Sequence, residues 1–183
     1  RDGLRESFSA GVLSSSTVYE DGAEIGPRKT YHSNGQLASN SPLVLGRVEG
    51  EVIRHYPDGQ VSERANYRAG LRHGSIETFH ENGPRASLAN YSGGVLNGSY
   101  QTRHSNGQLA TSESYSDGNS CGIWRSYDQN GNLNWEANYG ACPGAQDPEF
   151  PIERGFEGIV RLNEEAVSGA TLAISSGDEF QSS

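Results

Sequence analysis

Three histidines recur at equivalent positions along the sequence, and histidine rings are common metal ligands. His32, His80 and His104 are separated by multiples of 24 residues, and Tyr56 and Asp128 occupy the equivalent positions in two other copies. If each copy forms two strands, equivalent positions lie about 9.5 Å apart. Three side chains at that spacing cannot contact one ion. We therefore predict no metal site, and we expect the rings to flank a turn.

No other group of residues has the types and spacing that catalysis requires. The one G-x-S-x-G match, at residues 118–122, begins in a predicted hairpin turn rather than between a strand and a helix, so it does not form the elbow of a nucleophilic serine. Glycine-rich pieces such as residues 92–94 lie in predicted hairpin turns rather than between a strand and a helix, so they do not indicate a phosphate loop. Asp21, Asp58 and Asp117 also belong to predicted turns, where a structural role outweighs calcium binding. The sequence predicts no catalytic residue, no cofactor and no enzymatic activity.

The positions of these residues follow from a repeat of 24 residues. Its most regular feature is an Asn-Gly or Asp-Gly turn, and Ala10-Gly11 occupies this position in a degenerate first copy. The turn glycines are Gly35, Gly59, Gly83, Gly107 and Gly131. Such a dipeptide between alternating residues is the strongest short-range signal of a β-hairpin. These glycines are therefore assigned a structural role.

The spacing between turns predicts the fold class. Both connections in each copy are too short for a crossover helix, so neighbouring strands must be antiparallel. We predict that residues 1–142 are all-β and form a single-layer antiparallel meander of about six 24-residue β-hairpin repeats. A repeat array buries only a narrow strip in each copy, which fits a hydrophobic content of 33%.

Two registers fit the repeated turn. A two-residue type I′ loop would pair the tyrosine column, such as Tyr139, with the first glycine of the same copy, such as Gly122. Pro57 instead suits a type I turn closed by a glycine bulge, which would shift the pairing by one residue and regroup the faces. We favour the bulge.

The two cysteines flank the last predicted hairpin. Cys121 lies just before its first strand and Cys142 lies just past its second strand. In either register the two residues are close enough for a disulfide after a small turn of the chain. We predict this bond, with two free buried thiols as the alternative. A disulfide would imply an oxidising compartment.

Charge and hydropathy exclude several partners. The net charge is −9 and Lys29 is the single lysine, so nucleic-acid binding is not expected and docking on an anionic membrane is unlikely on electrostatic grounds. No apolar run approaches the roughly 20 residues of a membrane helix. The sequence contains no methionine, so Arg1 is not a translation start. We expect an exported protein from which an export signal or further repeats were removed; an arbitrary chain boundary is the alternative.

The composition changes after the repeats. Residues 143–155 are rich in proline and glycine and read as a linker. Residues 156–183 contain two strand-like runs, and we expect a short β extension there. It is either the start of an Ig-like domain or a strand donated to a partner.

The repeat has the form G-x-[VIYW]-x-x-[YF]-x-x-NG-x-L followed by Y-x-x-G-x-x-x-G. It resembles the MORN repeat, in the variant form of bacterial YwqK-like antitoxin proteins, over residues 1–142. The resemblance implies stacked β-hairpins and protein–protein contact, with lipid binding in some relatives. The absence of a lysine-rich face argues against the lipid role here. Residues 156–174 look like the opening strands of an Ig-like or carboxypeptidase-regulatory-like domain.

These observations favour a non-enzymatic, exported scaffold that binds another protein. The last copy is the most aromatic, and we expect solvent-exposed Trp124, Tyr127 and Trp135 to be its anchors. One alternative is a self-assembling fibre or surface subunit, in which edge strands pair with further copies of the chain. Others are an antitoxin or immunity protein, by the resemblance, and an accessory module of a larger enzyme.

Overall fold

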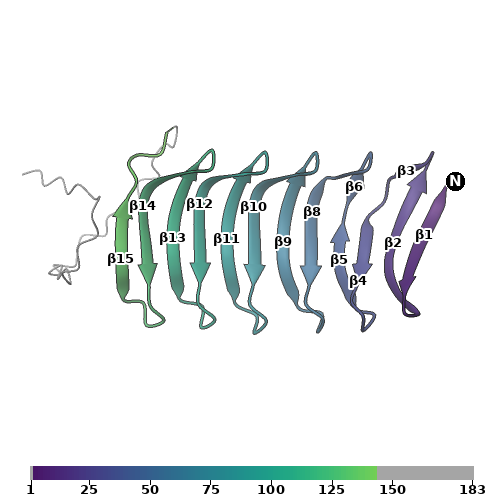
Figure 1. Ribbon diagram of the computed structural model, residues 1–183, viewed down its shortest axis with the longest axis horizontal. Helices are drawn as coiled ribbons and strands as arrows, with labels where there is room; N and C mark the ends of the chain where they lie inside the picture. Colours follow the sequence, from purple (N-terminus) through teal and green to yellow (C-terminus); the bar gives the residue numbers. More distant parts are fainter. Residues whose placement is uncertain (1, 144–183) are drawn as a thin grey trace, which may run out of the picture. The chain divides into compact units, whose positions relative to one another are not determined.

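The computed structural model describes residues 2–143, which form an antiparallel sheet with β1 at one end and β15 at the other (Figure 1). The sheet has thirteen strands in the order β1-β2-β4-β5-β8-β9-β10-β11-β12-β13-β14-β15, and β3 pairs with β2. Strands that follow one another along this path form six hairpins. The predicted all-β meander of about six hairpins is confirmed. The predicted linker and the β extension lie outside the described residues.

The strands differ in length, and the shortest, β3, β6 and β7, have two residues each. The first eight are β1 (Gly3–Ser9), β2 (Val12–Glu20), β3 (Ala23–Glu24), β4 (Arg28–Tyr31), β5 (Leu37–Ser41), β6 (Leu43–Val44), β7 (Arg47–Val48) and β8 (Gly50–His55). The others are β9 (Val61–Arg68), β10 (Leu71–Phe79), β11 (Arg85–Ser92), β12 (Val95–Arg103), β13 (Leu109–Ser116), β14 (Asn119–Tyr127) and β15 (Leu133–Asn138). The short β6 and β7 pair only with each other. Pro42 separates β5 from β6 along the chain and has no backbone N–H to continue a ladder.

The Asn-Gly and Asp-Gly turns at the lower edge of the sheet in Figure 1 have the favoured bulged form. In the turn before β13, the Gly107 N–H donates to the His104 carbonyl at 2.8 Å, and the His104 N–H donates to the Gln108 carbonyl at 2.9 Å. Gly107 has a φ of +86°, which glycine adopts without steric cost. This is a type I turn closed by a glycine bulge.

The bulge was expected to shift the pairing of the two strands by one residue and so to regroup the faces of the sheet. This prediction is wrong. A second irregularity follows each turn, so that Arg103 pairs with Leu109 but Thr102 pairs with Thr111. The skipped residues at this position are Ala38, Ser62, Ala86, Ala110 and Asn134. The second shift cancels the first, and Gly98 therefore pairs with Tyr115 as in the simple two-residue hairpin.

The turns at the upper edge are two-residue loops with positive φ at both positions, such as Asp117 (+47°) and Gly118 (+80°). Positive φ at both positions defines the type I′ turn. In the last four of these loops the second residue also binds the preceding hairpin: the Gly118 N–H donates to the Leu96 carbonyl at 2.8 Å. The same bond joins Gly46 to Glu24, Gly70 to Val48 and Gly94 to Arg72. The upper turns are thus hydrogen-bonded in series.

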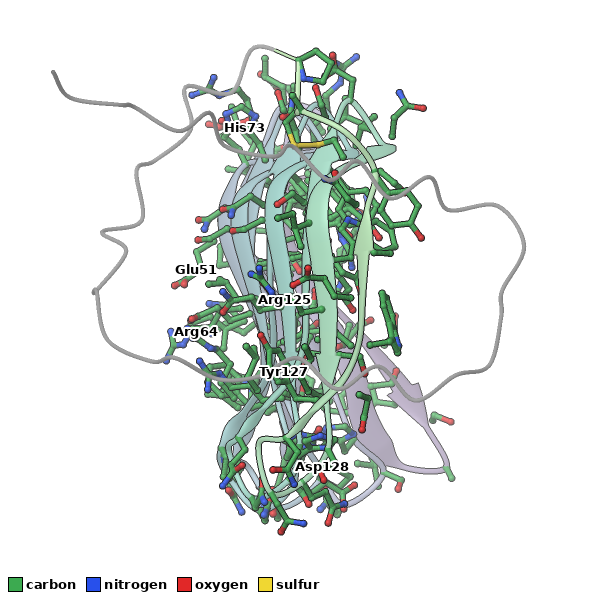
Figure 2. All side chains as sticks on the ribbon, turned by 90° about the vertical axis from the view of Figure 1, so that its left-hand side faces the viewer. Glu51, Arg64, His73, Arg125, Tyr127 and Asp128 are labelled. Carbon is green, nitrogen blue, oxygen red and sulfur yellow. A yellow bond between two sulfur atoms is a disulfide. The ribbon has the colours of Figure 1, made fainter. Side chains whose placement is uncertain are left out.

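Side chains alternate between the two faces of each strand, and paired residues share a face. We call one side the aromatic face; it carries Val52, Ala65, Ile76, Ala89, Tyr100, Tyr115, Trp124 and Tyr139. The other side, the back face, carries Glu51, Arg64, Arg125 and Tyr127, which lie together on one side of the sheet in Figure 2.

The best-buried strip runs along the centre of the aromatic face. Large and small residues alternate across it. Ala65 (0% exposed) lies between Val52 (1%) and Ile76 (4%) on the two adjacent strands, and Ile76 lies opposite Ala89 on its other side. The alternation lets a branched side chain cover its small neighbours on both adjacent strands. In the last two hairpins aromatic rings replace the aliphatic residues of this strip.

Candidate functional site

The aromatic face ends in a continuous row of rings. The Tyr100 and Tyr115 centroids are 6.4 Å apart, those of Tyr115 and Trp124 are 5.1 Å apart, and those of Trp124 and Tyr139 are 4.5 Å apart. The planes are tilted by 48° to 64°, which is a favourable geometry for aromatic pairs. The row is built by the compensated register, because it places the rings of neighbouring strands on the same face.

Polar contacts hold these rings in place. The Trp124 Nε1–H donates to the Ser114 carbonyl at 3.1 Å, and the Tyr115 hydroxyl donates to Glu113 Oε2 at 2.7 Å. Burial, and then the bond to Glu113, raise the pKa of Tyr115 well above its usual value, so its hydroxyl stays protonated. These contacts fix the orientation of two rings of the row.

The structure separates the three predicted anchors. Trp135 pairs with Ser126 and lies on the aromatic face, where 46% of it is exposed. Trp124 lies on the same face but is half-buried between its neighbouring rings, which corrects the expectation that it is solvent-exposed. Tyr127 is also half-buried, and it lies on the back face because it directly follows Ser126 in the strand. Tyr139, at 50% exposed, joins Trp135 as an accessible ring.

The predicted disulfide is present at the end of the row. Cys121 and Cys142 are bonded, with their Cα atoms 4.9 Å apart, and Cys121 is 3% exposed. The bond ties the residues after β15 back to β14. A disulfide in this position indicates an oxidising compartment.

The recurring histidines bind the next hairpin rather than a metal. The Nε2–H groups of His32, His80 and His104 donate to the His55, Arg103 and Tyr127 carbonyls at 2.8 to 2.9 Å, and the Tyr56 hydroxyl does the same to Phe79 at 2.6 Å. Each bond spans 23 residues along the chain. Asn34, Asn82 and Asn106 add parallel bonds to the next turn. Within residues 2–143 no three metal-binding side chains are grouped to hold an ion.

Asp128 occupies the histidine position in the last hairpin and has a different role. Its carboxylate accepts bonds from the Asn132 side chain and from the Asn130 and Asn132 backbone N–H groups at 2.8 to 2.9 Å. These bonds, with Asn132 first, lower the pKa of Asp128. An ionised carboxylate has no donor for a following carbonyl. The side-chain ladder along the lower edge therefore stops at this hairpin.

The ladder predicts a measurable contribution to stability. Replacing His104 by phenylalanine keeps a ring but removes the Nε2–H donor to Tyr127. We expect the free energy of unfolding to fall by about 1 kcal/mol in chemical denaturation, the usual net value of one such bond. His73→Phe is the matched control, because no hydrogen bond of its ring is seen in the described part of the chain. Equal losses in both variants would contradict a ladder role.

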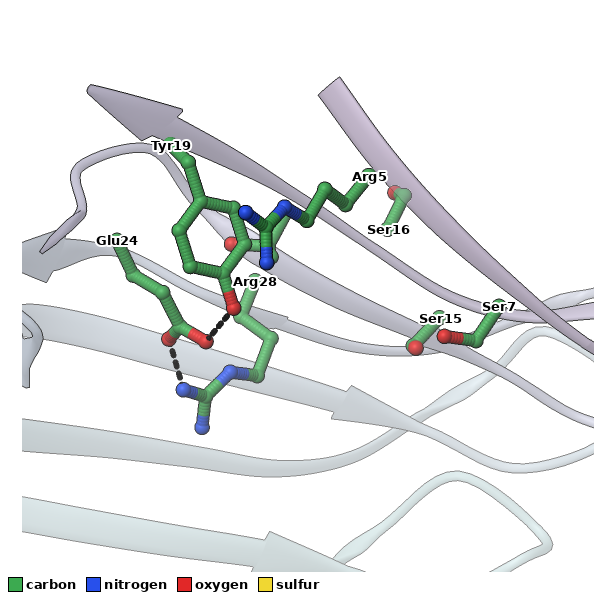
Figure 3. Close-up of a pocket in the computed structure, with 8 residues that line it drawn as sticks. Arg5, Ser7, Ser15, Ser16, Tyr19, Glu24 and Arg28 are labelled. Carbon is green, nitrogen blue, oxygen red and sulfur yellow. Dashed lines mark hydrogen bonds and ion pairs between the residues drawn. The ribbon is translucent and has the colours of Figure 1, made fainter. Parts of the chain in front are cut away.

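A second feature was not predicted from the sequence. A shallow pocket of about 280 Å³ lies in the first hairpins, lined by Arg5, Tyr19, Glu24, Arg28 and several hydroxyl groups (Figure 3). The first copy is the most degenerate, and its residues come together only through the pairing of β1 and β2 and the return of β3 and β4. No motif in the sequence predicts that these residues line one pocket.

Comparison with known families identifies three of the repeats. A model described as MORN repeat variant matches residues 24–42, 48–69 and 120–139. These segments cover the hairpins β4–β5, β8–β9 and β14–β15. The three segments are MORN-variant repeats, which confirms the resemblance; the match does not distinguish the YwqK-like subgroup. No curated protein matches the chain.

Repeats of this class are commonly protein-interaction or scaffold modules and are generally non-catalytic. Among the described residues, no helix has the length and apolar composition needed to cross a bilayer. Because repeats of this class commonly mediate protein interactions, the exposed rings make the end of the aromatic face the candidate interaction site.

Proposed function

We propose that this chain is a non-enzymatic, exported scaffold that binds another protein through the last hairpin of its aromatic face. The observation that carries the proposal is the pair of exposed rings, Trp135 (46%) and Tyr139 (50%), at the end of an ordered aromatic row. Tryptophan and tyrosine dominate the binding energy of protein interfaces, because they bury large areas at low conformational cost. Trp124 supports Tyr139 from behind and acts in positioning rather than contact.

Affinity capture from the native source tests the proposal. The double variant Trp135→Ala, Tyr139→Ala should retain less than about one tenth of the partner captured by the unmodified chain, since each anchor contributes more than 1 kcal/mol. The matched control is Ile123→Ala, Leu133→Ala, which removes two exposed apolar side chains (43% and 54%) from the back face of the same hairpin. Equal capture by both double variants would contradict partner binding through Trp135 and Tyr139.

Export is proposed because the disulfide joins the only two cysteines of the chain. Such bonds persist in secreted and periplasmic proteins and are rare in the cytosol. An antitoxin or immunity role is a narrower form of the same proposal, in which the captured partner is a toxin. Identification of the captured partner by mass spectrometry distinguishes an antitoxin role from a general scaffold role.

Self-assembly is a second candidate function. All of β1 is exposed, and both β1 and β15 pair with one neighbouring strand each in the described part of the chain. Edge strands with free backbone groups can pair with a second copy. Mass measurement in solution decides between the candidates, since a strict monomer at high concentration excludes assembly.

A further inference from the structure

The pocket in the first hairpins contains two guanidinium groups, and only one of them forms a salt bridge among the described residues. Arg28 forms an ion pair with Glu24, and Glu24 also accepts the Tyr19 hydroxyl at 2.7 Å. Arg5 instead lies over the Tyr19 ring, with its guanidinium carbon 4.1 Å from the ring centroid. In the described part of the chain Arg5 has no salt-bridge partner. Figure 3 shows both guanidinium groups on either side of the Tyr19–Glu24 pair.

Hydroxyl groups line the rest of the pocket. Arg5 pairs with Thr17 and Ser7 pairs with Ser15, so all four side chains share the aromatic face. The Ser7 and Ser15 hydroxyls lie next to each other in Figure 3. Thr17 Oγ1 is buried and has no hydrogen-bond partner within the described residues. A buried hydroxyl without a partner is uncommon and needs an explanation.

A guanidinium beside several hydroxyls is a donor set for an oxyanion. The lining carries two arginines and one glutamate, Arg5, Arg28 and Glu24, and therefore a net charge of +1, within a chain of net charge −9. A single negative charge balances this lining, whereas the charge of a doubly charged phosphate would exceed it, and Glu24 would repel the phosphate more strongly than a carboxylate. The chemistry therefore favours a carboxylate.

We propose that this pocket binds the carboxylate of an acidic side chain on the partner protein. The carboxylate lies against the Arg5 guanidinium, and the Thr17 and Ser15 hydroxyls donate to its oxygens. The proposal rests on the proposed scaffold function and adds a chemical requirement to the partner. The aromatic face then recognises two features: an acidic group at its first hairpin and an aromatic or apolar contact at its last.

The site can be tested on the isolated chain without the partner. The probe is acetyl-Gly-Glu-Gly-amide, titrated while backbone amide signals are followed by NMR, with acetyl-Gly-Gln-Gly-amide and inorganic phosphate as comparison ligands. We expect the glutamate peptide to shift the amides of Arg5, Thr17 and Tyr19. Arg5→Gln should weaken this binding roughly tenfold, as expected for a charge-assisted bond. Arg64→Gln removes an exposed back-face charge and should leave the affinity unchanged.

Three results would overturn the site. They are shifts of equal size with the glutamine peptide, an unchanged affinity in Arg5→Gln, and tighter binding of phosphate than of the glutamate peptide. Thr17→Val adds a second check, since it removes the hydroxyl at constant shape and should weaken the glutamate peptide several-fold. The peptide titration tests only this pocket, and affinity capture tests binding through Trp135 and Tyr139. Each proposal can therefore fail without the other.

Discussion

Replacing Trp124 by alanine is expected to lower the free energy of unfolding by about 3 kcal/mol, measured by chemical denaturation. The indole packs between the rings of Tyr115 and Tyr139, at 5.1 Å and 4.5 Å, and donates to the Ser114 carbonyl. Its removal deletes two aromatic contacts and leaves a gap that a single-layer sheet cannot fill from a second layer. The same change should reduce partner capture, because Tyr139 loses its support.

Trp124→Phe is the matched control. It keeps a ring between the two tyrosines and removes only the Nε1–H donor, so the expected loss is about 1 kcal/mol. A loss in Trp124→Ala no larger than in Trp124→Phe would show that the aromatic row contributes little to the last hairpins.

Removing the disulfide with Cys121→Ala and Cys142→Ala is expected to cost about 3 kcal/mol, the chain-entropy value for a loop that closes over 21 residues. The effect should be local, because each hairpin of a repeat array contacts only its neighbours. Hydrogen exchange should quicken in β14 and β15 and stay unchanged in β8–β11. Uniform quickening along the whole sheet would contradict this local role.

The same bond provides a test of export. In intact cells the two thiols should resist alkylation until a reductant is added, because Cys121 and Cys142 are bonded to each other. Free thiols in the native compartment would contradict both export and the contribution of the bond to stability there.

Much of the fold follows from the 24-residue period. The recurring glycines predict the turns, and the short connections then require antiparallel neighbours. The disulfide also follows, because Cys121 and Cys142 flank one hairpin in any register. These features depend on positions along the chain, which the sequence states directly.

The faces of the sheet could not be predicted in the same way. Pro57 correctly indicates a bulged turn, but the second shift occurs at residues such as Ala86 and Asn134, which carry no recognisable signal. One residue of register moves every side chain to the other face. The aromatic content of the last copy groups Tyr127 with the two tryptophans, but the structure puts it on the back face.

The sequence does not predict the histidine ladder either, although its donors recur at a fixed spacing. The acceptor of His80 is the backbone carbonyl of Arg103, and backbone carbonyls have no signature in a sequence. The available signal was chemical: three histidines and one tyrosine, all possible donors, share one column, and an acceptor, Asp128, ends it. Exclusion of a shared metal ion by spacing did not by itself reveal what the rings bind.

The central claim is that the partner contacts the aromatic face of the last hairpin. Site-specific photo-crosslinking tests it most directly, with a photoreactive phenylalanine placed at Trp135 in one variant and at Leu133 in another. Both positions are exposed, at 46% and 54%, and they lie on opposite faces of β15. We predict a crosslinked partner from position 135 and none from position 133. Crosslinking from position 133 alone, or equally from both positions, would contradict the claim.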